Sequence, residues 1–278
     1  MAPTVADRPI GVFDTGVGGF SVVLEMQRVL PHERIVYFGD TAHMPYGSRS
    51  ADDILHMTRQ ICAYMEQRGV KAAAAASNTI STVIDRCRSR FHFPLFSIIE
   101  AGARAAAEQS SPVGLIGTPA TVRSQAYPRL IGRLSPGMTV VSAACPHLSA
   151  LIEAGKTSAE DVDGEIKTAV DDILRRAAVK RLILACTHYP LVRDRIAGLY
   201  PDLELIDPAR RQALDVRDYL AEHGLLRDGE GSVELNTSGN PEQYRQTASR
   251  VGIASVMSVN RVCPVRPLEE DVGAPRRP

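Results

Sequence analysis

The stretch Arg181-Leu-Ile-Leu-Ala-Cys-Thr-His188 places a short apolar run directly before a thiol, a hydroxyl and an imidazole. The run lacks alternating polar and apolar residues, which is typical of a parallel strand buried on both faces. Ligands of parallel sheets bind beyond the carboxyl ends of the strands. The sequence therefore predicts that Cys186, Thr187 and His188 lie at the binding edge of such a sheet.

A matching segment lies earlier in the chain, where the strand-like run Lys71–Ala76 precedes Ser77, Asn78 and Thr79. Each segment brings a possible proton-transfer atom to the end of a strand, but one carries a thiol and the other a hydroxyl. Two facing thiols could act from opposite sides of one substrate carbon. A thiol that faces a serine could not do so equally, because the hydroxyl is the far weaker acid.

Short strand-like runs alternate with longer helical patterns along the whole chain. This alternation predicts an α/β fold with parallel sheets and helices on both faces. We expect strands at 9–13, 34–38, 71–76, 95–98, 113–116, 139–142, 181–184, 204–206, 232–236 and 255–258, and helices at 19–30, 51–67, from about 78, 120–131, 146–153, 159–178, 191–199, 210–222 and 241–251.

The bulk composition excludes several classes of protein. The 278 residues are 44% hydrophobic, enough for one large domain or two of about 100–150 residues. Lysine plus arginine and aspartate plus glutamate number 32 each, so we expect no electrostatic attraction to nucleic acid or to an anionic membrane. No apolar run approaches the ~20 residues of a membrane span, and the start of the chain lacks a signal-peptide pattern. We therefore expect a cytoplasmic protein.

Five cysteines with no CxxC spacing argue against a disulfide framework or a zinc site. A free cysteine usually acts as a small buried hydrophobe. We accordingly expect Cys62, Cys87, Cys145 and Cys263 to be packing residues. The tail 266–278 is rich in charge and proline, and we expect it to be disordered.

The loop after the first strand, Asp14-Thr-Gly-Val-Gly-Gly19, contains three glycines, which indicates a backbone that approaches a ligand closely. A nucleotide-phosphate loop is one alternative, although the spacing is neither GxGxxG nor GK[ST]. Asp14 could equally cap the following helix. The loop alone does not decide between these interpretations.

The other strand ends leave similar alternatives open. Ser77 or Asn78 could merely cap a helix. Residues 39–47 have ordinary turn chemistry. Cys186 precedes a helical segment, and a thiol that faces a helix start ionises more readily. His188 could assist it or could be structural, and its place beside a strand-end cysteine favours a functional role.

Taken together, these segments resemble the glutamate racemases of the cofactor-independent aspartate/glutamate racemase superfamily. Each segment alone is weak, but their order and spacing are specific, and the match runs from about residue 9 to 258. A further stretch, Thr237-Ser-Gly239 with Pro241-Glu242, fits the family's C-terminal segment. The segments that carry the resemblance are 13–19, 37–41, 45–47, 77–79, 116–118 and 185–191.

The resemblance implies two flavodoxin-like domains related by pseudo-twofold symmetry, with the active site in the cleft between them. One domain would comprise 1–97 plus 208–265, and the other 98–207. The implied activity is interconversion of L- and D-glutamate for peptidoglycan, with no cofactor and no metal. The implied partners are glutamate and a second copy of the chain in a homodimer, but neither nucleic acid nor a membrane.

The resemblance also implies roles for individual residues. Cys186 falls on one catalytic thiol, and Glu153 on a carboxylate that supports it. Asp14 and His188 would assist proton transfer, and the remaining residues would hold the carboxylates and ammonium of the substrate. The substrate-contacting positions are Asp14, Thr15, Tyr46, Gly47, Asn78, Thr79, Thr187 and His188, and we expect Thr118 to contact the substrate beside them.

Two positions depart from the family pattern. Thr15 replaces the usual serine and keeps the hydroxyl, whereas Ser77 stands where the family has its other catalytic cysteine. A thiol has a pKa of ~8.5 and a hydroxyl lies nearer to water at ~15.7, so the gap of about seven units corresponds to roughly 10 kcal/mol. We therefore expect severely reduced two-way turnover with retained ligand binding.

Ser77 leaves three interpretations open. It could be an engineered substitution in a racemase. It could be natural in a one-thiol enzyme of decarboxylase type, in which a single acid protonates the carbanion left by departing CO₂. The chain could also be a catalytically silent binding or regulatory protein. Glutamate and aspartate are not distinguished by these residues.

Overall fold

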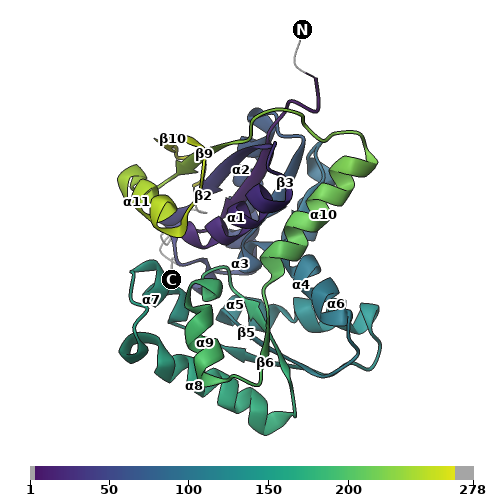
Figure 1. Ribbon diagram of the computed structural model, residues 1–278, viewed down its shortest axis with the longest axis vertical. Helices are drawn as coiled ribbons and strands as arrows, with labels where there is room; N and C mark the ends of the chain where they lie inside the picture. The colour runs from purple at the N-terminus through teal and green to yellow at the C-terminus, as the bar shows by residue number, and fades with distance from the viewer. Residues whose placement is uncertain (1–3, 267–278) are drawn as a thin grey trace, which may run out of the picture.

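The computed structural model describes residues 4–266, and its strands form two separate parallel sheets that lie one above the other in Figure 1. The first sheet has six strands in the order β10-β9-β2-β1-β3-β4, and the second has four in the order β6-β5-β7-β8. All of their pairings are parallel, as the alternation predicted. The strands are β1 Ile10–Asp14, β2 Arg34–Gly39, β3 Ala72–Ala75, β4 Leu95–Ser97, β5 Val113–Gly117, β6 Val140–Ala144, β7 Arg181–Ala185, β8 Glu204–Ile206, β9 Ser232–Thr237 and β10 Val256–Arg261.

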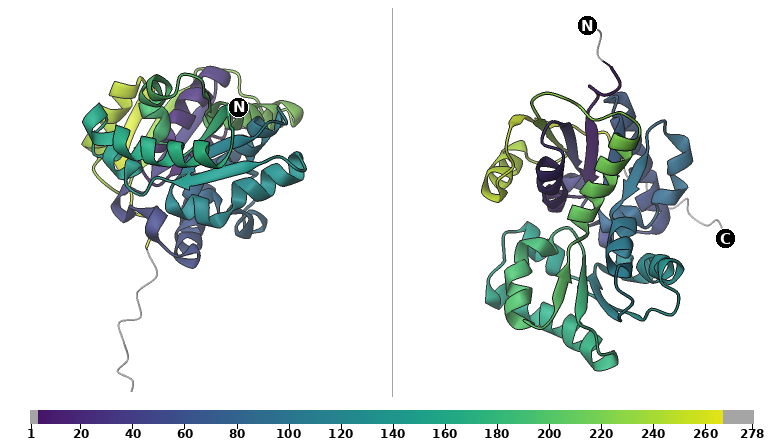
Figure 2. Two further views of the ribbon diagram at one scale, coloured as in Figure 1. Left: turned by 90° about the horizontal axis from the view of Figure 1, so that it is seen from below. Right: turned by 45° about the vertical axis from the view of Figure 1, so that its right-hand side comes forward.

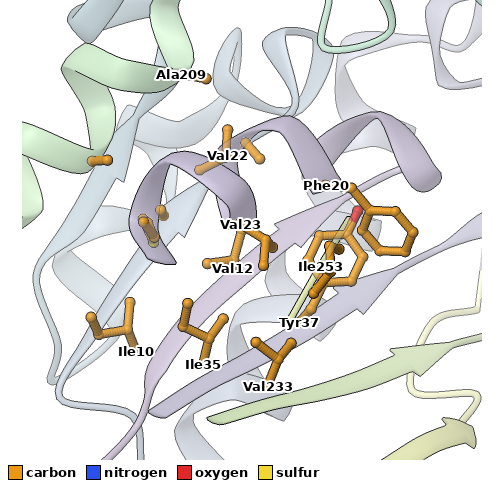
Figure 3. Packing of buried hydrophobic residues seen from close by; sticks show 14 of the residues in the cluster. Ile10, Val12, Phe20, Val22, Val23, Ile35, Tyr37, Ala209, Val233 and Ile253 are labelled. Carbon is orange, nitrogen blue, oxygen red and sulfur yellow. The ribbon is translucent and has the colours of Figure 1, made fainter. Parts of the chain in front are cut away.

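Helices cover both faces of the six-stranded sheet because its central strands are apolar on both sides. Ile10 and Val12 of β1 pack into one core with α1, whereas Phe13 points to the opposite face and packs under α2. Figure 3 shows the first of these cores, where Phe20 at the start of α1 lies beside Tyr37 of β2. The helices of this layer are α1 Phe20–Val29, α2 Ala51–Gln67, α3 Asn78–Ser81, α10 Pro208–Glu222 and α11 Pro241–Val251.

The four-stranded sheet is covered in the same way. Leu182 and Leu184 of β7 pack on one face, and Ile183 and Ala185 pack on the other. Every residue of β7 is buried, in agreement with the unbroken apolar run in the sequence. On one face lie α4 Ile98–Ala107, α5 Pro119–Ser124 and α6 Ala126–Leu134, and on the other α7 Leu148–Glu153, α8 Ala159–Arg176 and α9 Arg193–Leu199.

Helices α4 and α10 join the two layers and lie side by side in both Figure 1 and the right-hand view of Figure 2. Arg104 of α4 pairs with Asp215 of α10. Gln212 of α10 is fully buried and donates to the carbonyls of Ala75 and Phe96 at 3.0 Å. These contacts fix the end of β3 relative to the helices that connect the sheets.

The two chain crossings between the sheets follow β4 and β8. Strands β1–β4, β9 and β10 belong to the first sheet, and β5–β8 to the second. This distribution supports a division into 1–97 plus 208–265 and 98–207, which we retain as a proposal.

Several element boundaries differ from those expected. The helix expected over 120–131 is two helices, because Gln125 takes the left-handed conformation with φ 52° between α5 and α6. The segment after Asn78 forms only one helical turn, and the helix expected over 191–199 starts as a 3₁₀ turn. The 3₁₀ turns are Val17–Gly19, Thr41–His43, Tyr46–Ser48, Ile84–Arg86, Arg88–Arg90 and Tyr189–Val192.

Three of the four cysteines expected to pack are buried, namely Cys62, Cys87 and Cys145, but Cys263 is exposed and that prediction was wrong. It follows β10, the strand at the edge of the six-stranded sheet. Of the tail expected to be disordered, Arg266 is described, and its amide donates to Gln60 Oε1; residues 267–278 lie outside the described part of the chain. Among the described residues, no helix is both long and apolar enough to cross a membrane.

Candidate active site

The carboxyl ends of the two sheets meet at a cavity of about 530 Å³. Loops that follow β1, β2 and β3 of the first sheet line one side, and loops that follow β5, β6 and β7 of the second line the other. All the residues expected at the site line this cavity except Glu153: Asp14, Thr15, Tyr46, Gly47, Ser77, Asn78, Thr79, Thr118, Cys186, Thr187 and His188.

Cys186 begins a thiol–imidazole–carboxylate chain. The residue directly follows β7, is 6% exposed, and its Sγ lies 3.7 Å from Nδ1 of His188. The other ring nitrogen, Nε2, lies 2.5 Å from Oε2 of Glu153 at the end of α7. Glu153 therefore lies behind His188, outside the cavity wall, and holds the imidazole toward the sulfur.

The pKa of His188 is raised well above its ordinary value. Burial alone would lower it, but the contacts of the ring with Cys186 and with Glu153 outweigh the cost of burying the charge. The imidazole is therefore more readily protonated than an ordinary histidine side chain. A cation at this position stabilises negative charge on a neighbouring sulfur.

Asp14 lies at the end of β1 and is 1% exposed. Its carboxylate accepts hydrogen bonds from the Thr15 amide at 2.6 Å and from the Thr187 hydroxyl at 2.7 Å. Burial raises its pKa, and His188, Thr187, Thr15 and Ser77 oppose that rise. The helix-cap interpretation of Asp14 was wrong, because α1 begins after Gly19 and has no side-chain cap.

The glycine-rich loop leaves room for protein side chains. A Cβ at Gly18 would lie 2.5 Å from Thr187 Oγ1 and 2.7 Å from His188 Nδ1. A Cβ at Gly16 would lie 3.0 Å from both carboxylate oxygens of Glu153. The phosphate-loop interpretation is thus wrong, since the space along these glycines is filled by the second-sheet residues that form the site.

Ser77 has two kinds of contact. Its hydroxyl accepts the Ile80 amide at 3.4 Å and so caps α3, as the capping alternative predicted. The same residue lines the cavity, and its interaction with the carboxylate helps to lower the pKa of Asp14. A cap and a site residue are therefore not exclusive at this position.

Two hydroxyls and an amide connect the layers beside Ser77. Thr79 and Thr118 lie within 3.1 Å of each other through their hydroxyls. Asn78 Oδ1 accepts from the Tyr127 hydroxyl at 2.9 Å. Since Thr118 and Tyr127 belong to the second layer, these bonds cross the cleft and bring polar groups from both layers to one end of the cavity.

The loop with ordinary turn chemistry is tied down by Asp40. Its carboxylate accepts from the hydroxyls of Tyr46 and Ser238, both at 2.6 Å. Tyr46 is 2% exposed, and a Cβ at Gly47 would lie 3.4 Å from Thr118. The turn is therefore a rigid wall that approaches the second layer closely.

Some lining residues were missed by sequence reasoning. β6 runs to Ala144, two residues beyond its expected end, so Cys145 and the residues after it stand at a strand end. The strand-end rule would have found them had the boundary been right. Arg123 carried no such signal, because it lies near the end of α5. The missed residues are Met44, Pro45, Ser48, Pro119, Arg123, Pro146, His147, Ser149 and Ala150.

Two parallel-sheet layers with a buried thiol–imidazole–carboxylate chain between their carboxyl ends define an α/β protein with a candidate acid–base site in the cleft between its layers. A family model described as Asp/Glu/Hydantoin racemase matches residues 20–213. The chain belongs to this family.

Curated relatives agree over nearly the full length. The chain is 35% identical over 259 residues to glutamate racemase 3 of Caldanaerobacter subterraneus subsp. tengcongensis, covering 91% of this chain and 92% of that protein. It is 35% identical over 274 residues to the glutamate racemase of Desulforudis audaxviator, covering 94% and 100%.

Solved structures agree with the fold. Glutamate racemase isoform RacE1 from Bacillus anthracis has a TM-score of 0.87 at 30% identity and covers 93% of this chain and 99% of its own. The glutamate racemase of Francisella tularensis in complex with D-glutamate has a TM-score of 0.86 at 31% identity, covering 93% and 98%. The expected fold class, two α/β layers with the cavity between them, is confirmed.

Proposed function

We propose that this chain acts on glutamate as a cofactor-independent racemase. The observation that carries the proposal is the chain from Cys186 through His188 to Glu153 at the edge of a cavity lined by hydroxyls and an amide. The glutamate racemases named above support the substrate, since one was solved with D-glutamate.

In the proposed mechanism, the Cys186 thiolate removes the α-proton of L-glutamate and the imidazolium of His188 stabilises the thiolate beforehand. Asn78, Thr79 and Thr118 would donate to a substrate carboxylate, and Asp14 would accept from the ammonium group, with Thr15, Thr187 and the Tyr46–Gly47 backbone completing the grip. The carbanion then takes a proton on its opposite face, which gives D-glutamate.

Ser77 limits net racemisation in both directions. The hydroxyl must donate the proton for D-glutamate to form and must remove it for D-glutamate to react. A serine hydroxyl needs an adjacent general base to act as a nucleophile or a base. The one carboxylate on the described cavity wall is Asp14, and a carboxylate is too weak a base to give the serine the strength of a thiolate. We therefore expect hydrogen exchange with L-glutamate to survive better than exchange with D-glutamate, and net racemisation to be severely reduced.

The direct test is α-proton exchange in D₂O, followed by NMR in separate tubes of L- and D-glutamate. Exchange of L-glutamate alone supports Cys186 as the working base. Equal exchange of both enantiomers would overturn the role given to Ser77. A chain that binds neither enantiomer would overturn the proposed substrate.

A second candidate rests on Cys186 as the one thiol on the described wall of the cavity. A single acid can protonate the carbanion left by CO₂, so the chain could be a one-thiol decarboxylase of a malonate-type diacid. Release of CO₂ from such a diacid, without glutamate exchange, would favour it. Glutamate binding without any exchange would instead favour a catalytically silent binding protein.

The cellular role follows from the proposed activity. We propose that the protein supplies D-glutamate for peptidoglycan. We also propose that it is located in the cytoplasm and forms a homodimer. Rescue of a D-glutamate auxotroph by the unmodified chain, weaker than rescue by Ser77→Cys and absent with Cys186→Ala, tests the role. The dimer is tested by measuring the molar mass in solution by light scattering, which is expected to be twice the mass of the chain.

A further inference from the structure

Asn78 is held in one orientation at the cavity wall. It is 3% exposed, and its carbonyl oxygen, Oδ1, accepts the hydroxyl proton of Tyr127 at 2.9 Å. Its amide nitrogen, Nδ2, is buried and has no hydrogen-bond partner among residues 4–266. A buried donor without an acceptor is costly, so this nitrogen is a group prepared for an acceptor that arrives with a ligand.

Tyr127 is itself fixed in place. It is 1% exposed on α6 and packs in the core that α4 and α6 share with the four-stranded sheet. A Cβ at Gly102 of α4 would lie 2.6 Å from its hydroxyl oxygen, so the glycine leaves the space that the tyrosine fills. Burial, with smaller contributions from Asp207 and Cys186, raises the pKa of Tyr127. The hydroxyl therefore keeps its proton and acts as the donor.

We infer that Tyr127 is a positioning residue for substrate binding. Its hydroxyl occupies Oδ1 of Asn78 and thereby turns Nδ2 toward a carboxylate of the bound amino dicarboxylate. The inference rests on the proposed function. Tyr127 belongs to the second layer and Asn78 to the first, so the same bond also holds the two sides of the cleft together at the point where the ligand is gripped.

The orientation of the Asn78 amide determines whether it attracts or repels a carboxylate. An amide that presents NH₂ donates to a carboxylate, whereas a flipped amide would present its oxygen and repel it. Without the Tyr127 hydroxyl both orientations become available. Part of the binding free energy is then spent on selecting the productive one.

The test is a double-mutant cycle on binding rather than on turnover. The Kd for D-glutamate is measured by calorimetry for the unmodified chain, Tyr127→Phe, Asn78→Ala and the double variant. Tyr127→Phe is expected to weaken binding about fivefold to tenfold, the size of one oriented hydrogen bond. In the Asn78→Ala background the same substitution is expected to change the Kd less than twofold.

Tyr200→Phe is the matched control. It removes a tyrosine hydroxyl that donates to Asp171 at 2.7 Å, away from the cavity, and is expected to leave the Kd unchanged. A second readout is the ¹⁵N resonance of the Asn78 side-chain amide, identified by its loss in Asn78→Ala. It is expected to shift in Tyr127→Phe and not in the control.

The outcomes are separable. An unchanged Kd in Tyr127→Phe overturns the inference and leaves the proposed function standing. An equal loss in both backgrounds also overturns it, because the ring would then act through packing and not through Asn78. If the unmodified chain binds neither enantiomer of glutamate, the proposed function fails and the inference fails with it.

Discussion

At the scale of single residues, Ser77 carries the largest expected effect. Ser77→Cys is expected to raise racemase activity in both directions by several orders of magnitude. The reason is that a thiol is more acidic than the serine hydroxyl by an amount that corresponds to roughly 10 kcal/mol. The rate in each direction is measured from the circular dichroism of glutamate, because the L- and D-enantiomers give signals of opposite sign. Ser77→Ala is the control and should remove any remaining net turnover. Equal activity in Ser77→Cys and the unmodified chain would contradict this account of the site.

Glu153 should show its role in the pH dependence of stability. The pKa of His188 is higher in the folded than in the unfolded chain, so protonated His188 contributes to the free energy of unfolding. This contribution is fully present below the unfolded pKa of about 6.5 and is lost as the pH rises through the folded pKa. Glu153→Gln removes one of the two groups that raise it. The loss of unfolding free energy in this variant should therefore be largest below about pH 6.5 and should shrink as the pH rises through the folded pKa of His188. Urea titrations at several pH values measure this, and a pH-independent loss would contradict it.

At the scale of elements, the turn Val17–Gly19 must stay thin. Gly18→Ala is expected to push the loop that carries Thr187 and His188 and to slow exchange of L-glutamate about 100-fold, the usual effect of misplacing reacting groups by about 1 Å. Gly164→Ala on α8 is the control. Apart from its chain neighbours and the nearby backbone of α8, no heavy atom of residues 4–266 lies within 4 Å of the added Cβ, so Gly164→Ala should keep full activity and gain up to ~1 kcal/mol of stability. Equal exchange rates in both variants would show that the loop has room to adjust.

The amino end of β3 depends on an ion pair that periodicity did not predict. Lys71 interrupts an apolar run, yet its side chain is fully buried, with Nζ 2.6 Å from Glu33 and within 2.8 Å of the carbonyls of Ala6 and Leu225. Lys71→Met leaves the Glu33 charge buried and unpaired, and is expected to cost ~3–5 kcal/mol in urea unfolding. The Lys71→Met, Glu33→Leu double variant should recover much of the loss. Arg86→Met, which breaks an exposed pair, should change little.

At the scale of the whole molecule, both layers should respond to one ligand. The hydroxyls of Thr79 and Thr118 meet across the cleft, and α10 packs against helices of both layers. We therefore expect one calorimetric unfolding transition that shifts upward with glutamate, by ~2.7 kcal/mol of added stability at 100 times the Kd. Two transitions, of which only one moves with ligand, would mean that the layers unfold independently and that one of them holds the ligand alone.

Most of the fold could be read from local sequence patterns. The strand Arg181–Ala185 and the helix Ala51–Gln67 were predicted at or within a residue of their bounds, because continuous apolar runs and capped amphipathic segments are local signals. The break at Gln125 was not predicted, since a glutamine in the left-handed region has no reliable local signature. The exposure of Cys263 was also missed, because burial depends on whether another layer covers the strand end.

The candidate site shows the same division. The strand-end rule brought Asp14, Ser77 and Cys186 to one cavity, although their roles stay predictions until activity is measured. Whether Asp14 caps a helix, and whether the glycine loop holds a phosphate, could not be decided from spacing. Both answers depend on what lies across the cleft. Asp14 accepts a hydrogen bond from Thr187, and the space along the glycine loop is filled by His188 and Glu153.

The sequence by itself determined the class of fold, the strand ends that carry chemistry and the presence of a hydroxyl where a second thiol was expected. These are properties of short segments, and short segments encode them through periodicity and residue type. Only the tertiary structure decided that Glu153 contacts His188, that Tyr127 donates a hydrogen bond to Asn78 and that the glycines make room for side chains. Each of these joins groups from different elements across the cleft, and the packing of the two layers sets such distances.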